Sequence, residues 1–141
     1  MDNAIVLKYQ VSTEDFTRAG EASGSIKSTL KKLGFDPQVV RKVAIAMYEG
    51  EINLVIHGGG GVIDVDIDGE KVTMVLTDHG PGIPDVSKAM EEGWSTAPDN
   101  VRSLGFGAGM GLPNMKKYTD EMQIDSTVGV GTTVTMVVKL I

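Results

Sequence analysis

The placement of glycine constrains this chain more than any other feature of its sequence. It has 18 glycines, and many of them cluster at 58–61, 80–82, 105–111 and 129–131. Glycine loses more backbone entropy on folding than other residues, so it suits tight bends and places where a ligand approaches the backbone closely. Any single cluster is equally consistent with an ordinary loop. Four clusters beside acidic and amide residues favour a ligand site built from the loops between helices and strands.

The segments between these clusters predict the order β, α, α, β, β, loop, α, β, β. Caps predict the helix starts, with Ser12 or Thr13 before the first helix and Asp36-Pro37 before the second. This order lacks Rossmann alternation, so residues 1–141 are expected to form a single domain, an α+β two-layer sandwich. Its mainly antiparallel mixed sheet would carry helices on one face. The strands are predicted at 4–11, 62–68, 71–77, 121–127 and 132–140, and the helices at 13–33, 36–57, 85–92 and 109–118.

Composition excludes several classes of function. The chain has no cysteine, which rules out disulfides, thiolate metal sites and thiol nucleophiles. No apolar run approaches the ~20 residues of a membrane span, and the start Met1-Asp2-Asn3-Ala4 lacks the features of a signal peptide. We therefore expect a cytoplasmic protein without a membrane partner. The net charge of -6, with no visible basic patch, argues against a nucleic-acid partner.

The second predicted helix carries polar residues at the border of its apolar face. At ~100° per residue, Glu49 and Asn53 lie one turn apart beside three isoleucines. Burying a carboxylate and an amide there is costly unless both are satisfied. A hydrogen-bond network within the protein would satisfy them, and so would a bound metal or polar ligand. In the second interpretation Asn53 offers Mg²⁺ a hard oxygen, and Glu49 orients or deprotonates a nucleophile. His57 lies near the helix end, where a cap or a solvated residue is the usual interpretation.

A second segment, Asp78-His79-Gly80-Pro81-Gly82-Ile83, directly follows a predicted strand. By itself the pattern is typical of a turn, because Asp and Gly both favour turns. An ionised Asp at a strand end can also accept a hydrogen bond from an exocyclic amine such as adenine N6. Gly82 would let a flat ring approach the backbone.

A third segment, Gly105–Leu112, opens a predicted helix. Unpaired N–H groups and the helix dipole make a glycine-rich helix start a site for anions. A dinucleotide-binding fold does not fit, because no strand directly precedes the segment. A P-loop does not fit either, because Pro113-Asn114 stand where Gly-Lys-Ser/Thr would be expected. A glycine-rich loop without a function is the alternative.

Together with Gly131-Thr132 on a late strand, the three segments resemble the Bergerat ATP-binding fold. This fold is shared by DNA gyrase, the heat-shock ATPase chaperone, histidine kinases and MutL-type mismatch-repair proteins. The runs Asp78–Asp85, Met90–Thr96 and Gly107–Lys116 most resemble the small serine kinases that regulate bacterial sigma factors. The resemblance implies ATP and Mg²⁺ as cofactors and a small regulatory partner of the anti-anti-sigma type. A sigma factor or phosphatase as partner, and a homodimer, stay open.

The resemblance also assigns roles to individual residues. Glu49 would be the general base and Asn53 the Mg²⁺ ligand. Asp78 would bind adenine N6, with Thr132 helping it to hold a water. The base pocket is assigned to Gly80, Gly82 and Ile83, and the phosphate-binding segment to Gly105, Gly107, Ala108, Gly109, Met110, Gly111 and Leu112.

Three functions are compatible with this pattern. The first is a serine/threonine kinase that transfers the ATP γ-phosphate to a small partner protein. The second is a regulator that uses ATP only to change its shape and its affinity for partners. The third is the detached ATPase domain of a histidine kinase, which would need a phosphoacceptor histidine on a dimerisation helix. Neither His57 nor His79 has that context.

Overall fold

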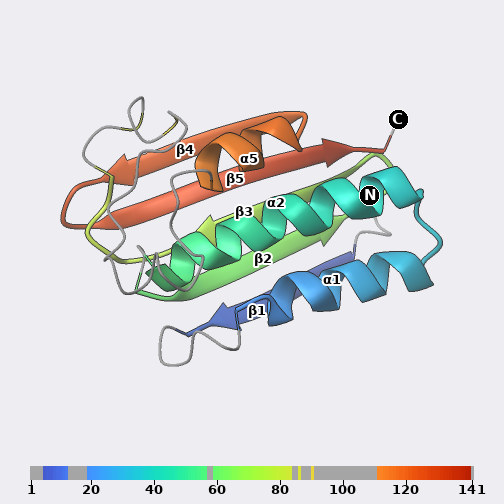
Figure 1. Ribbon diagram of the computed structural model, residues 1–141, viewed down its shortest axis with the longest axis horizontal. Helices are drawn as coiled ribbons and strands as arrows, with labels where there is room; N and C mark the ends of the chain where they lie inside the picture. The colour runs from blue at the N-terminus through green and yellow to red at the C-terminus, as the bar shows by residue number, and fades with distance from the viewer. Residues whose placement is uncertain are drawn as a thin grey trace.

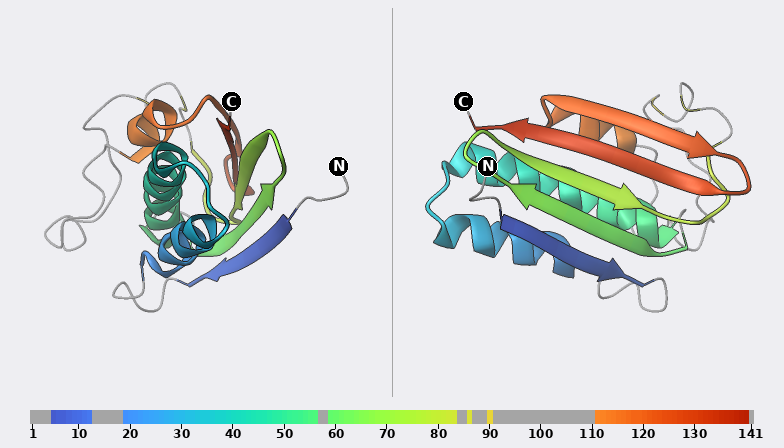
Figure 2. Two further views of the ribbon diagram at one scale, coloured as in Figure 1. Left: turned by 90° about the vertical axis from the view of Figure 1, so that its right-hand side faces the viewer. Right: turned by 180° about the vertical axis from the view of Figure 1, so that it is seen from behind.

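The computed structural model describes residues 5–12, 19–56, 59–83, 86, 90 and 111–140. Within them, helices cover one face of a five-stranded sheet, so the molecule has two layers (Figure 1). The left view of Figure 2 shows the same separation of the helices from the sheet. In chain order the elements are β1 (Ile5–Val11), α1 (Glu21–Lys32), α2 (Pro37–Ile56), β2 (Gly61–Ile67), β3 (Lys71–Thr77), α5 (Gly111–Lys117), β4 (Glu121–Thr127) and β5 (Gly131–Lys139).

The sheet has the strand order β1-β2-β3-β5-β4. Its register aligns Tyr9, Ile63, Leu76, Val134 and Ile124 in one row across all five strands. These residues belong to the core or pack against it, so the row faces the helices. The predicted α+β two-layer fold is confirmed. The described strand pairs are all antiparallel, so the sheet is not mixed within the part of the chain that the structure describes.

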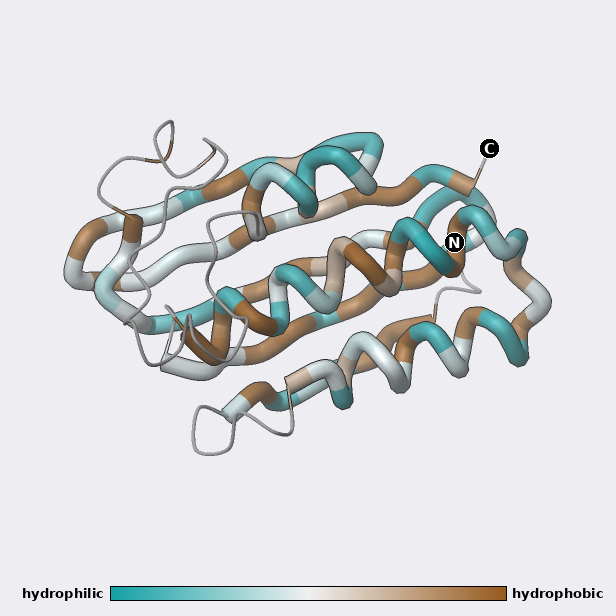
Figure 3. The backbone as a smooth tube through the Cα atoms, in the orientation of Figure 1, coloured by the Kyte–Doolittle hydropathy of each residue, from teal (hydrophilic) through white to brown (hydrophobic). Residues whose placement is uncertain are grey.

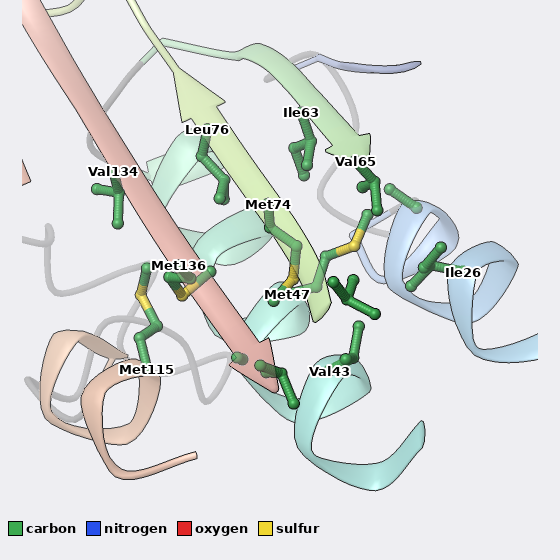
Figure 4. Close-up of a cluster of buried hydrophobic side chains, with 14 of the residues drawn as sticks. Ile26, Val43, Met47, Ile63, Val65, Met74, Leu76, Met115, Val134 and Met136 are labelled. Carbon is green, nitrogen blue, oxygen red and sulfur yellow. The ribbon is translucent and has the colours of Figure 1, made fainter. Parts of the chain in front are cut away.

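The core fills the space between α2 and the central strands. Met47 of α2 lies among Ile63, Met74 and Met136 of the sheet, all of them fully buried (Figure 4). Alternate strand residues point to this side because side chains along a strand alternate between its two faces. Hydrophilic and hydrophobic residues are interspersed along α1 and α2, as expected for helices with one buried face (Figure 3). A Cβ on Gly50 would collide with the Leu76 side chain, so this glycine lets α2 pack closely on β3.

The helix predicted from a cap at Ser12 or Thr13 to about residue 33 is not continuous. Residues 13–18 lie outside the described part of the chain, and the prediction is wrong at residues 19–20. The chain turns at 19–20, where Gly20 has a φ of 104°, and α1 begins at Glu21. That left-handed conformation interrupts a helix and suits glycine, which has no Cβ to clash with the following carbonyl.

The cap of α1 comes from another helix. Glu51 of α2 is only 3% exposed, and its two carboxylate oxygens accept the backbone N–H groups of Ala22 and Ser23, each at 3.1 Å. Helix N-termini favour negative charge and leave N–H groups unpaired. The Glu51 carboxylate therefore supplies the negative charge and accepts two of the unpaired N–H groups. It joins α1 to α2 through a tertiary contact that the local sequence of α1 does not reveal.

Other predicted boundaries agree with the structure. Asp36 caps α2, because its carboxylate accepts the Gln38 N–H at 2.8 Å. Helix α2 ends at Ile56, within a residue of the prediction, whereas His57 lies outside the described residues. The predicted helix at 85–92 also lies outside them, apart from two isolated positions. Among the helices described, none is long and apolar enough to cross a membrane.

Candidate functional site

Asp78 sits at the end of β3, where the sheet continues to pair for one more step. Its backbone N–H donates to the Thr132 carbonyl at 2.9 Å. Its Oδ1 accepts the N–H groups of Gly80 at 2.9 Å and Thr132 at 3.1 Å. The other oxygen, Oδ2, has no hydrogen-bond partner among the described residues. A carboxylate held in this way keeps one oxygen available for an exocyclic amine.

A hydroxyl pair supports the turn that follows Asp78. The Ser126 hydroxyl accepts the N–H of Ile83 at 2.7 Å and lies 2.8 Å from the Thr132 hydroxyl. Thr132 is buried. These contacts hold the segment after β3 against β4 and β5, so Asp78, Ile83 and Thr132 form one hydrogen-bonded unit.

Gly82 allows this turn to approach the β4–β5 hairpin closely. Its φ is 80°, and a Cβ there would lie 2.5 Å from the Thr127 carbonyl oxygen and 2.9 Å from Val128 Cα. Both the conformation and the contact therefore require glycine. Across the same corner, the Gly129 N–H donates to the Pro81 carbonyl at 2.9 Å. These contacts give Gly82 a packing role at the β4–β5 hairpin, and its role in a base pocket stays a prediction.

Glu49 lies half-buried on α2, facing α5. Its Oε2 accepts a hydrogen bond from the Asn114 side-chain amide at 3.2 Å. Burial raises the pKa of the Glu49 carboxyl, and the hydrogen bond from Asn114 lowers it by a smaller amount. A raised pKa brings a carboxylate closer to the range in which it can accept a proton from a reacting group. The position is consistent with general-base chemistry.

Asn53 follows one turn later on the same face of α2. Its side-chain nitrogen donates to the Met115 sulfur at 3.6 Å, which leaves its oxygen without a partner among the described residues. That oxygen fits a magnesium ligand, because Mg²⁺ binds through few protein oxygens and retains waters and phosphate oxygens. The described residues contain no cluster of three or more His, Cys, Asp or Glu placed to hold a metal. A magnesium ion here would therefore depend on Asn53 and on the phosphates of a nucleotide.

The predicted phosphate segment lies mostly outside the described residues. The residues that lie outside are Gly105, Gly107, Ala108, Gly109 and Met110. Helix α5 begins at Gly111, and Leu112 is buried against the core. The described contacts therefore give Leu112 a packing role.

Two side chains that the sequence did not single out complete the described contacts. Asn114 was noted only because it breaks the P-loop pattern, yet it is the partner of Glu49. Ser126 was read only as part of a strand, yet it links Ile83 to Thr132. Neither the helical pattern around Asn114 nor the alternating strand pattern around Ser126 indicates these contacts. A signal for Ser126 does exist in the sequence. Pairing the two last strands as a hairpin places its hydroxyl opposite Thr132.

Known proteins are similar to this chain in sequence and in fold. The sequence model of the histidine kinase-like ATPase domain matches residues 13–138. The serine/threonine-protein kinase RsbT of Bacillus subtilis (strain 168) is 32% identical over 110 residues, covering 75% of this chain and 77% of that protein. The anti-sigma F factor of Clostridium acetobutylicum is 31% identical over 143 residues, covering 96% of this chain and 93% of that protein.

A solved structure supports the fold independently. The crystal structure of the RsbU and RsbW domains of a Mycobacterium tuberculosis protein aligns with a TM-score of 0.65. The alignment covers 96% of this chain and 32% of that longer one, at 18% identity, so it bears on the fold alone. The family match implies ATP binding. The chain belongs to the histidine kinase-like ATPase family and is related to the RsbT and anti-sigma F factor switch kinases.

Proposed function

We propose that this chain is an ATP-dependent serine/threonine kinase of the anti-sigma type, which phosphorylates a small regulatory protein. The observation that carries the proposal is the half-buried Glu49 carboxylate, which accepts a hydrogen bond from the Asn114 amide and lies one helical turn before Asn53. A kinase uses a carboxylate held in this way to accept a proton from the attacking hydroxyl. Relatives named as a serine/threonine kinase and as anti-sigma factors support the same class.

In the proposed reaction, the partner's hydroxyl oxygen attacks the γ-phosphorus of ATP and ADP departs. Glu49 accepts the proton of that hydroxyl, and Asn114 holds the carboxylate in place. Asp78 and its hydrogen-bonded turn hold the adenine through the free Oδ2. Asn53 would hold Mg²⁺, which neutralises phosphate charge when it is bound.

The partner is proposed to be a small regulatory domain of the anti-anti-sigma type that presents one Ser or Thr near the γ-phosphate. The names of the anti-sigma F factor relatives support a partner in sigma-factor regulation. A sigma factor or a phosphatase is the alternative partner.

The experiment is a transfer assay with ATP labelled on the γ-phosphate. The purified chain is incubated with candidate single-domain regulatory proteins, and the labelled residue is identified by mass spectrometry. We expect label on a serine or threonine and its loss with Glu49→Gln. Asn53→Ala should remove the Mg²⁺ dependence of ATP binding while the circular dichroism spectrum is retained.

Two results would contradict the proposal that the chain is a serine/threonine kinase. Nucleotide-dependent binding of a partner without any transfer of label by the wild type would indicate a regulator that only senses ATP. Label on a histidine would indicate a detached histidine-kinase domain. Unfolding of Asn53→Ala would instead assign Asn53 to the structural hydrogen-bond network.

A further inference from the structure

Residues of α1, α2 and the connection between them line a groove, and the two helices run side by side in Figure 1. It has a volume of about 580 Å³, which lies within the range of sites that accept small ligands or large side chains. None of the residues proposed above for nucleotide binding lines it. The lining residues are Lys27, Lys31, Phe35, Pro37, Val40, Arg41, Ala44 and Ile45.

The floor of this groove is apolar. Val40 is buried, and Phe35, Ala44 and Ile45 are half-buried, so apolar surface is left facing the groove. Phe35 also packs against the core, which gives the floor a fixed support. Covering such a surface with apolar side chains of a partner is favourable, because it removes apolar area from water.

The rim of the groove is cationic. Lys27 and Lys31 are exposed and stand one turn apart on α1. Arg41 lines the α2 side, and its guanidinium carbon lies 5.6 Å from the centroid of the Tyr118 ring. Within the described part of the chain, none of the three cations forms an ion pair with a carboxylate. They are therefore available to an acidic partner.

This positive rim contrasts with the charge of the whole chain, which is -6. The turns that flank the strands carry acids such as Asp68, Glu70 and Asp120. A wide anionic membrane would also meet this negative charge, and the phosphates of a nucleic acid would leave the apolar floor uncovered. An acidic protein segment needs contact only at the groove. The helices α1, α2 and α5 hold seven of the 13 basic residues: Lys27, Lys31, Lys32, Arg41, Lys42, Lys116 and Lys117.

We propose that this groove binds an acidic amphipathic helix of a partner protein. Apolar side chains of that helix pack on Phe35, Ala44 and Ile45, and carboxylates one turn apart face Lys27 and Lys31. The stretch of α2 from Pro37 to Ile45 spans about 12 Å at the helical rise, which matches two turns of a bound helix. The site is separate from the proposed kinase function, so binding does not require nucleotide.

The test is an NMR titration of the ¹⁵N-labelled full chain without nucleotide. The probe is a synthetic amphipathic peptide of about 18 residues, long enough to form a helix, with leucines on one face flanked by glutamates one turn apart. Two matched peptides replace the glutamates with glutamine or the leucines with serine. We expect amide shifts at the groove residues, and weaker binding by about tenfold or more for each matched peptide.

Charge reversal locates the contact. The double variant Lys27→Glu with Lys31→Glu should weaken binding of the acidic peptide by about tenfold or more. The control is Lys32→Glu, which is exposed on the same helix but does not line the groove, and it should change the affinity by no more than about twofold. Thermal unfolding of each variant checks that the fold is intact, and the matched peptides test the wild type without any substitution.

Several outcomes would overturn the proposal. They are an absence of shifts at millimolar peptide, shifts confined to the sheet, equal binding of the glutamine peptide, and an equal effect of Lys32→Glu. Tighter binding at the same residues by a DNA duplex or by phosphatidylglycerol vesicles would also overturn it. Loss of kinase activity leaves these measurements unaffected, so failure of the kinase proposal and failure of the groove are distinguishable.

Discussion

The two ends of the candidate site are built in different ways. At the end proposed to bind adenine, Asp78 follows a strand, accepts two backbone N–H groups and belongs to a network closed by Ser126 and Thr132. At the other end, Glu49 stands on a helix with Asn114 as its one hydrogen-bond partner in the described residues, and burial raises its pKa. Recognition of adenine needs fixed geometry, which backbone hydrogen bonds supply. Proton transfer needs a carboxylate whose charge is incompletely stabilised, and a carboxylate with few hydrogen bonds meets this need.

The largest expected effect separates the chemistry from the binding. Glu49→Gln should slow phosphoryl transfer by roughly 10²–10⁴-fold, the usual contribution of a positioned general base. ATP affinity should stay close to that of the wild type, because this end of the site does not contact the adenine. Single-turnover transfer and calorimetry measure the two quantities. An unchanged transfer rate would show that Glu49 is not the general base.

The next effect tests whether the base end depends on close backbone packing. Gly82→Ala places a Cβ against Thr127 and Val128 at a φ of 80°, so the free energy of unfolding should fall by about 2–4 kcal/mol. Gly69→Ala is the control, because nothing lies within 4 Å of its added Cβ. Urea unfolding curves give the values. Equal stability of the two variants would mean that the corner is loosely packed.

Asp78→Asn tests recognition alone. Asparagine can keep an oxygen facing the two N–H groups, but it presents an amide where the adenine amine would bind. ATP affinity should fall by about 1–3 kcal/mol, the cost of a mispaired buried polar contact. Affinity equal to that of the wild type, measured by calorimetry, would remove Asp78 from the site.

Ser126→Ala should have a smaller effect on the same property. Loss of its hydroxyl leaves the Ile83 N–H without its partner, which should weaken ATP binding by about 1 kcal/mol. The neighbouring Thr127→Ala is a matched control, because that side chain is exposed. If both variants bind alike, the hydroxyl pair does not support the turn.

The smallest effect concerns stability and pH. Because burial raises the pKa of Glu49 in the folded state, the stability linked to this carboxyl is fully present below its ordinary pKa of about 4.3 and is lost as pH rises through the folded pKa. Glu49→Gln should therefore be as stable as the wild type or slightly more stable at pH 7. This advantage should disappear as pH falls below about 4.3. Urea unfolding at pH 7 and pH 4 gives the difference, and an advantage that grows on acidification would contradict the shift.

Much of the fold could be predicted because its signals are local. Asp36 before Pro37 marked the start of α2, and the helix ends within one residue of its prediction. The helical period placed Glu49 and Asn53 on one border, where both are half-buried. The helix predicted over 13–33 is wrong at residues 19–20, because the left-handed conformation of Gly20 interrupts it directly before α1.

The sequence by itself determined the order of the elements and the residue types at the candidate site, because caps, periodicity and glycine positions act over a few neighbours. Only the tertiary structure decided which distant groups meet. Glu51 caps a helix about 28 residues earlier in the chain, and Asn114 reaches Glu49 across 65 residues. The same packing lines one groove with Lys27 and Arg41, although the sequence shows no basic cluster. Such contacts depend on how whole elements pack, and no local pattern specifies which side chains then face each other.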